Sequence, residues 1–318
     1  MRFNGKPFVA PDDVDENVGD SPRRPPEETP THGIALSDLA FSGGTVEADI
    51  KFNESEKAVG ELILAYNPTT REMLTAGIGG WPGMFSVREW VRNSTVNQDE
   101  SHSSSPAMHW NTIEITGDRL NIQAGETYHV CAALRGSQIR LSVNGIQVIS
   151  TQRRGTVPKS SSAGLFCGSV KPVEVTNFIV TPETPRAFVV MQFSAPYTDV
   201  YLGVIKSVCE EFGITAIRAD EIYGPGVIVQ DIVEQVVGAQ LVIADISVVN
   251  ANVYFEVGYA LASKKPIVLL AKKDTALPFD VSGFRVLFYE DSIGGKAKVE
   301  DGLRKHLTAL VGPADTRV

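Results

Sequence analysis

The chain has 318 residues, of which 43% are hydrophobic, and carries a formal net charge of −9. This length predicts two domains, and the acidic balance argues against nucleic acid or an anionic membrane as an obligate partner, because phosphate binding needs clustered Lys and Arg. The three cysteines have no CxxC spacing, so no disulfide framework or metal site is expected. No signal peptide and no membrane-length apolar run is recognised, so the chain is expected to be cytoplasmic.

The first 33 residues are predicted to form a flexible arm, because residues 10–33 are rich in Pro and acids and poor in apolar residues. From 34 to 181 apolar residues recur with period two. In "TVEADIKF" four apolar residues fall on one face and three charged residues on the other, which is typical of a half-buried strand. Similar stretches follow, and the pair Asn144-Gly145 favours a tight hairpin turn. This segment is therefore predicted to be a β-sandwich.

The pattern changes at "TPETP", residues 181–185, where we expect a weakly packed domain boundary. Over 186–318 apolar strands such as "RAFVVMQF", "LVIADIS" and "PIVLLAKK" alternate with helical segments, the last beginning near Lys296. Strands that are apolar throughout and alternate with helices indicate a parallel sheet covered on both faces. The fold class is thus multidomain: an all-β domain followed by an α/β domain.

Ligands of such sheets bind outside the carboxyl ends of the strands, so the loops at 194–198, 223–226 and 248–252 are the candidate site. Glu256 follows the last loop. If Asn252 caps the helix that begins there, Glu256 is its fourth residue, where the helix dipole keeps the carboxylate ionised. A solvated acid that complements the helix dipole is the alternative interpretation.

The chemistry open to this domain is narrow. Its one histidine, His306, is placed on the last helix, away from the strand ends, so Ser-His-Asp or Cys-His catalysis has no base. Neither GxGxxG nor GxxxxGK[ST] occurs, which argues against hydride and phosphoryl transfer. Carboxylate chemistry at an anomeric carbon remains, in which an acid stabilises or attacks an oxocarbenium-like centre.

Further candidate residues flank Glu256 on the three loops. The predicted substrate-binding set is Phe193, Ser194, Tyr197, Asp220, Tyr223, Asn250, Asn252 and Tyr254. Phe193 and Tyr197 are expected to sandwich a base or nicotinamide ring. Asp220 is expected to bind a ribose hydroxyl or to serve as a turn residue. At least one of Tyr254 and Phe255 is expected to pack in the core, and Asp245 to be a buried partner that positions the loop.

The strings "RADE", "ADIS" and "NANVYFEVGYALASKKPIVLL" resemble the TIR-like and nucleoside 2-deoxyribosyltransferase-like domains of bacterial antiphage defence effectors. The resemblance covers about residues 186–291 and implies a flavodoxin-like sheet with Glu256 as the catalytic glutamate. For TIR-like members it implies cleavage of NAD at the nicotinamide-ribose bond, with NAD as a substrate and no resident cofactor. It also implies activation by self-assembly into a homo-oligomer or filament.

Two departures from the family pattern bear on the activity. Ala251 replaces the usual Pro, and Asn250 stands where deoxyribosyltransferases carry a substrate-orienting Asp, which favours NAD cleavage over deoxyribosyl transfer. A deoxyribosyltransferase-like enzyme and a non-catalytic nucleotide-binding or scaffold protein are the alternatives. The resemblance leaves open whether the ADP-ribose product is open or cyclised.

The first domain resembles concanavalin A-like (LamG-like) sandwiches in "TAGIGGWPGMFSVREW" and "SSAGLFCGSVKPVEVTNFIV". Some sandwiches of this class are glycosidases with an E-x-D-x-E motif, whereas here Lys51 follows Glu47 and Asp49 in place of the third acid. These charges are therefore predicted to be the solvated face of a strand. The domain is expected to sense, bind or assemble, with a carbohydrate or protein ligand and its three tryptophans as core residues or ligand platforms.

Overall fold

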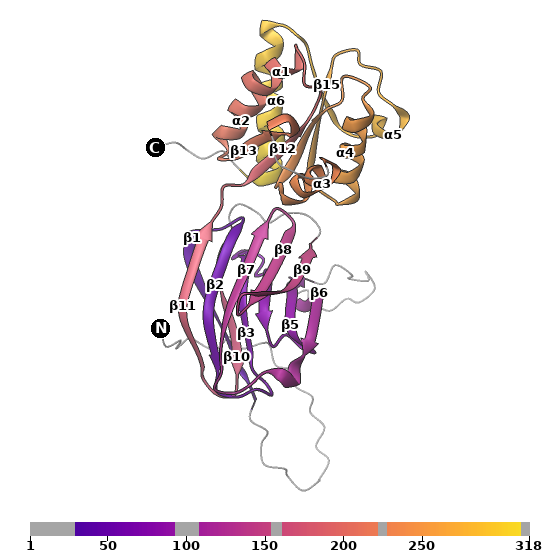
Figure 1. The fold of residues 1–318 in the computed structure, drawn as a ribbon. Helices are drawn as coiled ribbons and strands as arrows, with labels where there is room; N and C mark the ends of the chain where they lie inside the picture. Colours follow the sequence, from indigo (N-terminus) through magenta and orange to yellow (C-terminus); the bar gives the residue numbers. More distant parts are fainter. Residues whose placement is uncertain (1–28, 93–107, 154–160, 222–227, 313–318) are drawn as a thin grey trace, which may run out of the picture.

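The computed structural model describes residues 29–92, 108–153, 161–221 and 228–312. An antiparallel β-sandwich is followed by an α/β domain with a parallel sheet, which confirms the predicted fold class (Figure 1). Among the described residues no helix is long and apolar enough to cross a membrane.

Two antiparallel sheets form the sandwich. The six-stranded sheet has the order β1 (Thr31–Ala40), β10 (Ser162–Ser169), β3 (Val59–Tyr66), β4 (Met73–Ile78), β5 (Gly83–Arg92) and β6 (Met108–Asp118), with a short helix η1 (Arg119–Asn121) after it. The five-stranded sheet has the order β11 (Val173–Pro182), β2 (Gly44–Phe52), β7 (Thr127–Arg135), β8 (Gln138–Val143) and β9 (Ile146–Gln152).

The period-two pattern of β2 places its apolar residues in the core between the two sheets. Val46, Ala48, Ile50 and Phe52 are fully buried, as the alternation predicts. The predicted hairpin turn joins β8 and β9, and its two residues adopt the positive φ values that such a turn requires: 51° at Asn144 and 78° at the following glycine.

The amino-terminal boundary differs from the prediction. β1 begins at Thr31 and pairs with β10 from Thr31–Ser169 onward, so residues 31–33 belong to the sandwich and not to an arm. Composition missed them because an edge strand obtains its order from backbone hydrogen bonds to its neighbour, which any residue except Pro can make. Residues 29 and 30 precede the strand without regular structure, and residues 1–28 of the predicted arm lie outside the described residues.

The C-terminal sheet is fully parallel. Its order is β13 (Thr215–Arg218), β12 (Arg186–Val190), β14 (Leu241–Asp245), β15 (Ile267–Lys272) and β16 (Val286–Tyr289). The chain leaves β12, the first strand of this domain, to one side to form β13 and then to the other side to form β14, which is the flavodoxin-like order. The switch in strand order therefore lies at β12, where such sheets place their ligands.

Helices cover both faces of this sheet (Figure 1). On one face lie the continuous helical segment α1 (Tyr197–Val200), η2 (Tyr201–Ile205) and α2 (Lys206–Glu211), together with α6 (Ile293–Val311). On the other lie α3 (Ile228–Gly238), α4 (Ala251–Ala262) and α5 (Phe279–Ser282). The last helix starts at Ile293, earlier than the predicted Lys296, because the Ser292 side chain accepts the backbone N–H of Gly295 and caps it.

The junction between the domains is more tightly held than its prolines suggested. Glu183, directly after β11, donates its backbone N–H to the carbonyl of Gly43 at 3.0 Å and pairs with Arg135 at 2.7 Å. A Cβ at Gly44 would overlap the backbone of Thr181. The two domains are thus joined by a short connection that the sandwich holds.

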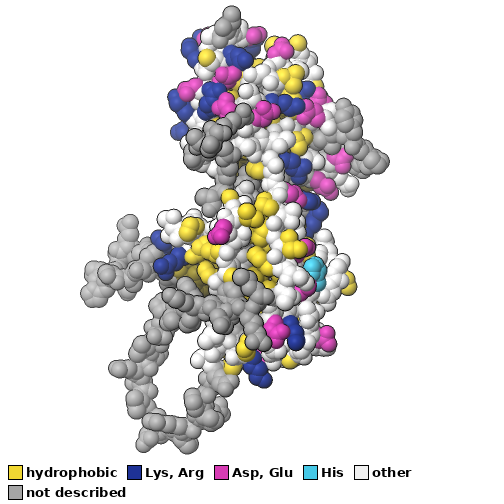
Figure 2. Space-filling model, turned by 90° about the vertical axis from the view of Figure 1, so that its left-hand side faces the viewer, with side chains coloured by type: hydrophobic (Ala, Val, Ile, Leu, Met, Phe, Trp, Pro, Cys, Tyr) yellow, Lys and Arg dark blue, Asp and Glu magenta, His cyan; other side chains and the backbone are white. Residues whose placement is uncertain are grey.

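Surface composition differs between the two domains. Figure 2 shows hydrophobic side chains gathered on the visible side of the sandwich, whereas charged side chains of both signs are scattered over the C-terminal domain. Exposed apolar residues occur on one edge strand of each sheet of the sandwich, with Leu36 and Leu39 on β1 and Phe178 and Ile179 on β11.

We expect Ile50→Ala to lower the free energy of unfolding of the sandwich by about 2–5 kcal/mol, because it leaves a cavity in a closed core. Ile146→Ala is the matched control, since Ile146 is 70% exposed whereas Ile50 is fully buried; it should change stability by no more than about 0.5 kcal/mol. Urea denaturation measures both. Equal effects of the two changes would contradict the assignment of this core.

Candidate active site

A cleft of about 740 Å³ opens at the carboxyl ends of β12 and β14, between α3 and α4. It brings together five of the predicted residues from two loops and one helix: Phe193, Ser194, Asn250, Asn252 and Glu256. Strand order explains the assembly, because β12 and β14 are neighbours and the segments that follow them leave the same edge of the sheet.

Asn250, and not Asn252, caps α4. Its backbone is extended, with φ −132°, and its Oδ1 accepts the backbone N–H of Asn252 at 2.9 Å. Its Nδ2 donates to Oε1 of Gln192 at 3.1 Å. The carboxamide of Asn250 therefore ties the start of α4 to the segment that follows β12, and Glu256 falls in the second turn of the helix instead of the first.

Glu256 is 5% exposed and is the central acid of the cleft. Burial raises the pKa of its carboxyl from 4.5 to about 7. This corrects the expectation of a solvated carboxylate kept ionised by the helix dipole: that effect fades beyond the first turn, and desolvation dominates. Among the described residues no side chain forms a hydrogen bond or an ion pair with the Glu256 carboxyl. Near neutral pH it is therefore divided between its protonated and ionised forms.

A buried hydrogen-bond network holds the loop that leads from β14 to α4. Asp245, at the end of β14, accepts the Tyr289 hydroxyl at 2.6 Å and the backbone N–H of Ser247 at 2.9 Å. Ser247 Oγ in turn accepts the backbone N–H of Lys272 at 2.7 Å. The network connects the carboxyl ends of β14, β15 and β16, so Asp245 positions the loop and does not line the cleft.

Three predicted residues lie elsewhere. Tyr197 packs against the core on the opposite face of the sheet. Asp220 forms a two-point ion pair with Arg218, at 2.6 and 2.7 Å, and those hydrogen bonds are the main reason why the pKa of its carboxyl is lowered. Tyr254 packs in the core between sheet and helices, and its buried hydroxyl has no hydrogen-bond partner among the residues that the structure describes. Tyr223 lies outside the described residues.

The cleft also contains residues that the sequence analysis missed. Gln192 and Phe255 line it, and so do Val229, Asp231 and Ile232 of α3. The sequence analysis expected at least one of Tyr254 and Phe255 to pack in the core. The structure packs Tyr254 there and leaves Phe255 on the cleft. Asp231 gave no signal, since it stands 25 positions before Glu256 and only the packing of α3 on α4 brings both acids to one cleft.

No group of three or more His, Cys, Asp or Glu side chains is arranged to hold a metal ion within the described ranges. His306 lies on α6 and does not line the cleft. The polar and aromatic side chains that line the cleft are carboxylates, amides, a hydroxyl and two phenyl rings.

A second, smaller cavity of about 220 Å³ lies on the sandwich. Trp81, which is 73% exposed, stands at it with the guanidinium of Arg119 5.7 Å from its ring centroid. Arg119 donates to the backbone carbonyls of Glu56, Ala58 and Gly79, which fixes its position. A second indole, Trp110, lies under the Arg88 guanidinium at 4.1 Å.

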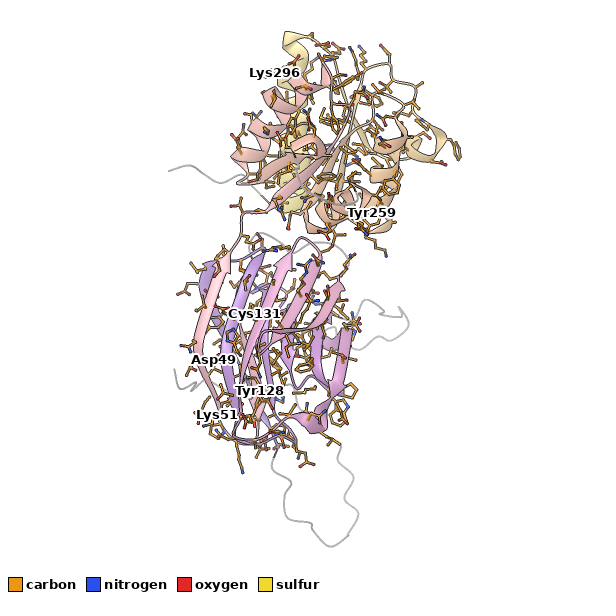
Figure 3. All side chains as sticks on the ribbon, viewed as in Figure 1. Asp49, Lys51, Tyr128, Cys131, Tyr259 and Lys296 are labelled. Carbon is orange, nitrogen blue, oxygen red and sulfur yellow. The ribbon has the colours of Figure 1, made fainter. Side chains whose placement is uncertain are left out.

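The acids of the strand motif lie apart from this cavity. Asp49 and Lys51 are on β2 of the five-stranded sheet (Figure 3). Asp49 is bound by His129 Nδ1 at 2.8 Å and by Asn177 Nδ2 at 2.6 Å, and Glu47 is 3.9 Å from His129. They form a hydrogen-bonded polar cluster on the outer face of the sheet, as expected for a solvated strand face.

Comparison with known proteins finds likenesses to solved structures alone. No family model matches the chain, and no curated protein matches it. The carbohydrate-binding module CBM66 from Bacillus subtilis is 14% identical and covers 48% of this chain and 81% of its own, with a TM-score of 0.34. A 2-deoxyribosyltransferase from Bacillus psychrosaccharolyticus is 16% identical and covers 36% and 90%, with a TM-score of 0.30. A CMP N-glycosidase from Clostridium botulinum is 17% identical and covers 37% and 98%, with a TM-score of 0.28. At these values no family is assigned to the chain.

We expect Glu256→Gln to stabilise the protein above neutral pH. Because the folded-state pKa of Glu256 is about 7 and its ordinary value is 4.5, the protonated acid is tolerated below pH 4.5, and stability is lost as pH rises through 7. The Gln variant avoids this loss, so its advantage should grow from near zero at pH 4.5 to at most about 3 kcal/mol at pH 8.5. Denaturant titrations of both proteins at the two pH values measure it, and an advantage independent of pH would contradict the buried acid.

Proposed function

We propose that the C-terminal domain cleaves the N-glycosidic bond of a ribosylated substrate, and that NAD, cut at the nicotinamide-ribose bond, is that substrate. One observation carries the proposal: a buried carboxylate without a partner among the described residues, Glu256, in a cleft at the switch in strand order. A cleft of about 740 Å³ is within the size range of small-molecule sites.

The ionised form of Glu256 supplies the chemistry. As the bond between C1′ and the nicotinamide nitrogen breaks, nicotinamide leaves as a neutral molecule with the bonding electron pair, and positive charge develops at C1′. A carboxylate at that point stabilises the charge or attacks C1′. Water then adds to C1′ and loses a proton, which yields ADP-ribose; attack by a nucleophile of the same molecule instead yields a cyclic product.

The cleft offers matching contacts for the rest of the substrate. Phe193 and Phe255 are both exposed on it and provide faces against which a nicotinamide or base ring can stack. Ser194 and Asn252 provide donors and acceptors for ribose hydroxyls. Asp231 adds a second carboxylate on the α3 side. The pair of Phe193 and Phe255 thus replaces the predicted pair of Phe193 and Tyr197 as the aromatic contact.

The alternatives stay open to the same assays. Deoxyribosyl transfer fits less well, because the side chain of Asn250 is an amide whose two ends already bind Gln192 and the backbone of Asn252. A non-catalytic nucleotide-binding protein would use the same cleft without turnover. The predicted homo-oligomer stays a prediction, for which the exposed apolar residues of β1 and β11 are the candidate contacts.

For the sandwich we propose a carbohydrate ligand at the second cavity. An exposed indole stacks on the C–H face of a sugar ring, and the fixed guanidinium of Arg119 lies beside it. Burial lowers the pKa of His32, which lines the same cavity, so its imidazole is neutral and offers both a donor and an acceptor to hydroxyl groups. A protein ligand is the alternative.

Purified protein incubated with NAD should release nicotinamide, and Glu256→Gln should reduce the rate at least about 100-fold, because the charge that stabilises the cation is lost. The wild-type kcat/KM should rise with pH through about 7, where Glu256 ionises. Glu234→Gln is the matched control, an exposed acid of α3, and should keep its rate. Full activity of Glu256→Gln excludes this acid, whereas exchange of bases between deoxynucleosides favours the transferase alternative.

Trp81→Ala should weaken binding of neutral oligosaccharides about tenfold, because a stacking platform is lost. Phe279→Ala removes another highly exposed aromatic side chain, which does not line the cavity, and should leave binding unchanged. A glycan array followed by titration calorimetry measures the effect. If the wild type binds no oligosaccharide, or if both variants bind like it, the carbohydrate site is wrong.

A further inference from the structure

The C-terminal end of α3 lies where the two domains touch. The backbone carbonyl of Val237 accepts the backbone N–H of Ser137 at 3.2 Å and its Oγ at 3.4 Å. Ser137 belongs to the turn between β7 and β8 of the sandwich and is buried. Carbonyls in the last turn of a helix lack partners within it, so the sandwich satisfies one that α3 leaves open.

Only glycine fits beside Ser137 in this turn. Gly136 has a φ of +57°, and a Cβ built there would overlap the carbonyl oxygens of Val237 and Ala239. The turn thus lies directly on the end of the helix.

Lys265 holds the same carbonyls from within the C-terminal domain. Its Nζ donates to the carbonyl of Val237 at 2.5 Å and to that of Ala239 at 2.7 Å. Burial lowers the pKa of this amine to about 7, while the carbonyls, at the negative end of the helix dipole, favour its protonated form. The end of α3 is therefore fixed from two sides, by its own domain and by the sandwich.

The opposite end of α3 forms one wall of the cleft. Val229, Asp231 and Ile232 line it from the first turn of the helix, and α3 packs against α4, which bears Glu256. The helix has 11 residues, so about 16 Å of rigid backbone separate the two ends. A shift of the C-terminal end of α3, which contacts the sandwich, therefore moves the residues at its other end that line the cleft.

The turn is also connected to the sandwich cavity. The carbonyl of Ser137 accepts the backbone N–H of Arg153 at 2.9 Å, and Arg153 pairs with Glu89 of β5 at 2.8 Å. The residue before Glu89 is Arg88, which lines the cavity. A ligand that alters β5 would thus act on the turn through the ion pair of Glu89 and Arg153.

We propose that the Gly136–Ser137 turn regulates the cleft by holding the C-terminal end of α3. While the turn contacts α3, the wall of the cleft that α3 forms stays in place; when the turn is displaced, that wall is held less firmly. The sandwich then controls the C-terminal domain through α3, in addition to the covalent connection at Glu183. The part of this inference that concerns activity rests on the proposed function; the part that concerns α3 does not.

The test compares two glycines in turns of the same domain. Gly136→Ala and Gly145→Ala both place a side chain at positive φ, but the added Cβ meets the α3 carbonyls at Gly136 and open space at Gly145. In hydrogen exchange of the full chain, amides of residues 229–238 should exchange at least about tenfold faster in Gly136→Ala than in Gly145→Ala. Equal exchange in the two variants overturns the proposal.

A second pair covers a failure of Gly136→Ala to fold. Ser137→Val crowds the contact with Val237, and Ser142→Val makes the same change on the outer side of β8. The first should speed exchange of α3, and the second should not; the same rate in both overturns the coupling. If the wild type releases nicotinamide, Gly136→Ala should lower kcat/KM more than Gly145→Ala. No release by the wild type contradicts the proposed function alone, because exchange reports on α3 without substrate.

Discussion

Desolvation of a single carboxyl group is the constraint on which the C-terminal domain depends. Glu256 lies on α4 in the cleft and is buried, and the free energy of burying its charge raises its pKa to about 7. Two sets of hydrogen bonds hold the segments around it in place. Asn250 joins the start of α4 to the segment after β12, and Asp245 joins the ends of three strands through Ser247 and Tyr289.

This arrangement separates the acids of the domain into distinct roles. Asp220 accepts a hydrogen bond from the Arg218 guanidinium, and Asp245 accepts one from the Tyr289 hydroxyl, so both carboxyl groups already have partners within the protein. Glu256 and Asp231 face the cleft, and an acid whose pKa lies near the working pH is suited to chemistry because both of its forms are available. The location and electrostatics of Glu256 are therefore those that the proposed cleavage of a glycosidic bond requires.

The two domains contact each other through a few hydrogen bonds to backbone groups. The sandwich has its own closed core, and the C-terminal sheet has one on each face. Two links lie between them. Glu183 in the connecting segment pairs with Arg135 of the sandwich, and the Gly136–Ser137 turn donates to a backbone carbonyl at the end of α3. Contacts to backbone groups leave little trace in side-chain patterns, which is why the junction was expected to be weakly packed. The glycine at position 136 shows the tight approach only once the helix end is placed beside it.

The sequence by itself determined the fold class, the strands with strict alternation and the Asn144-Gly145 turn, because all of these follow from local periodicity and backbone preference. Only the tertiary structure decided which side chains meet. The cap at Asn250 placed Glu256 two residues deeper in the helix, packing turned Tyr254 inward and Phe255 toward the cleft, and α3 brought in Asp231. The pKa of Glu256 was likewise beyond local reasoning, because desolvation depends on every atom that excludes water, and those atoms come from segments far apart in the chain.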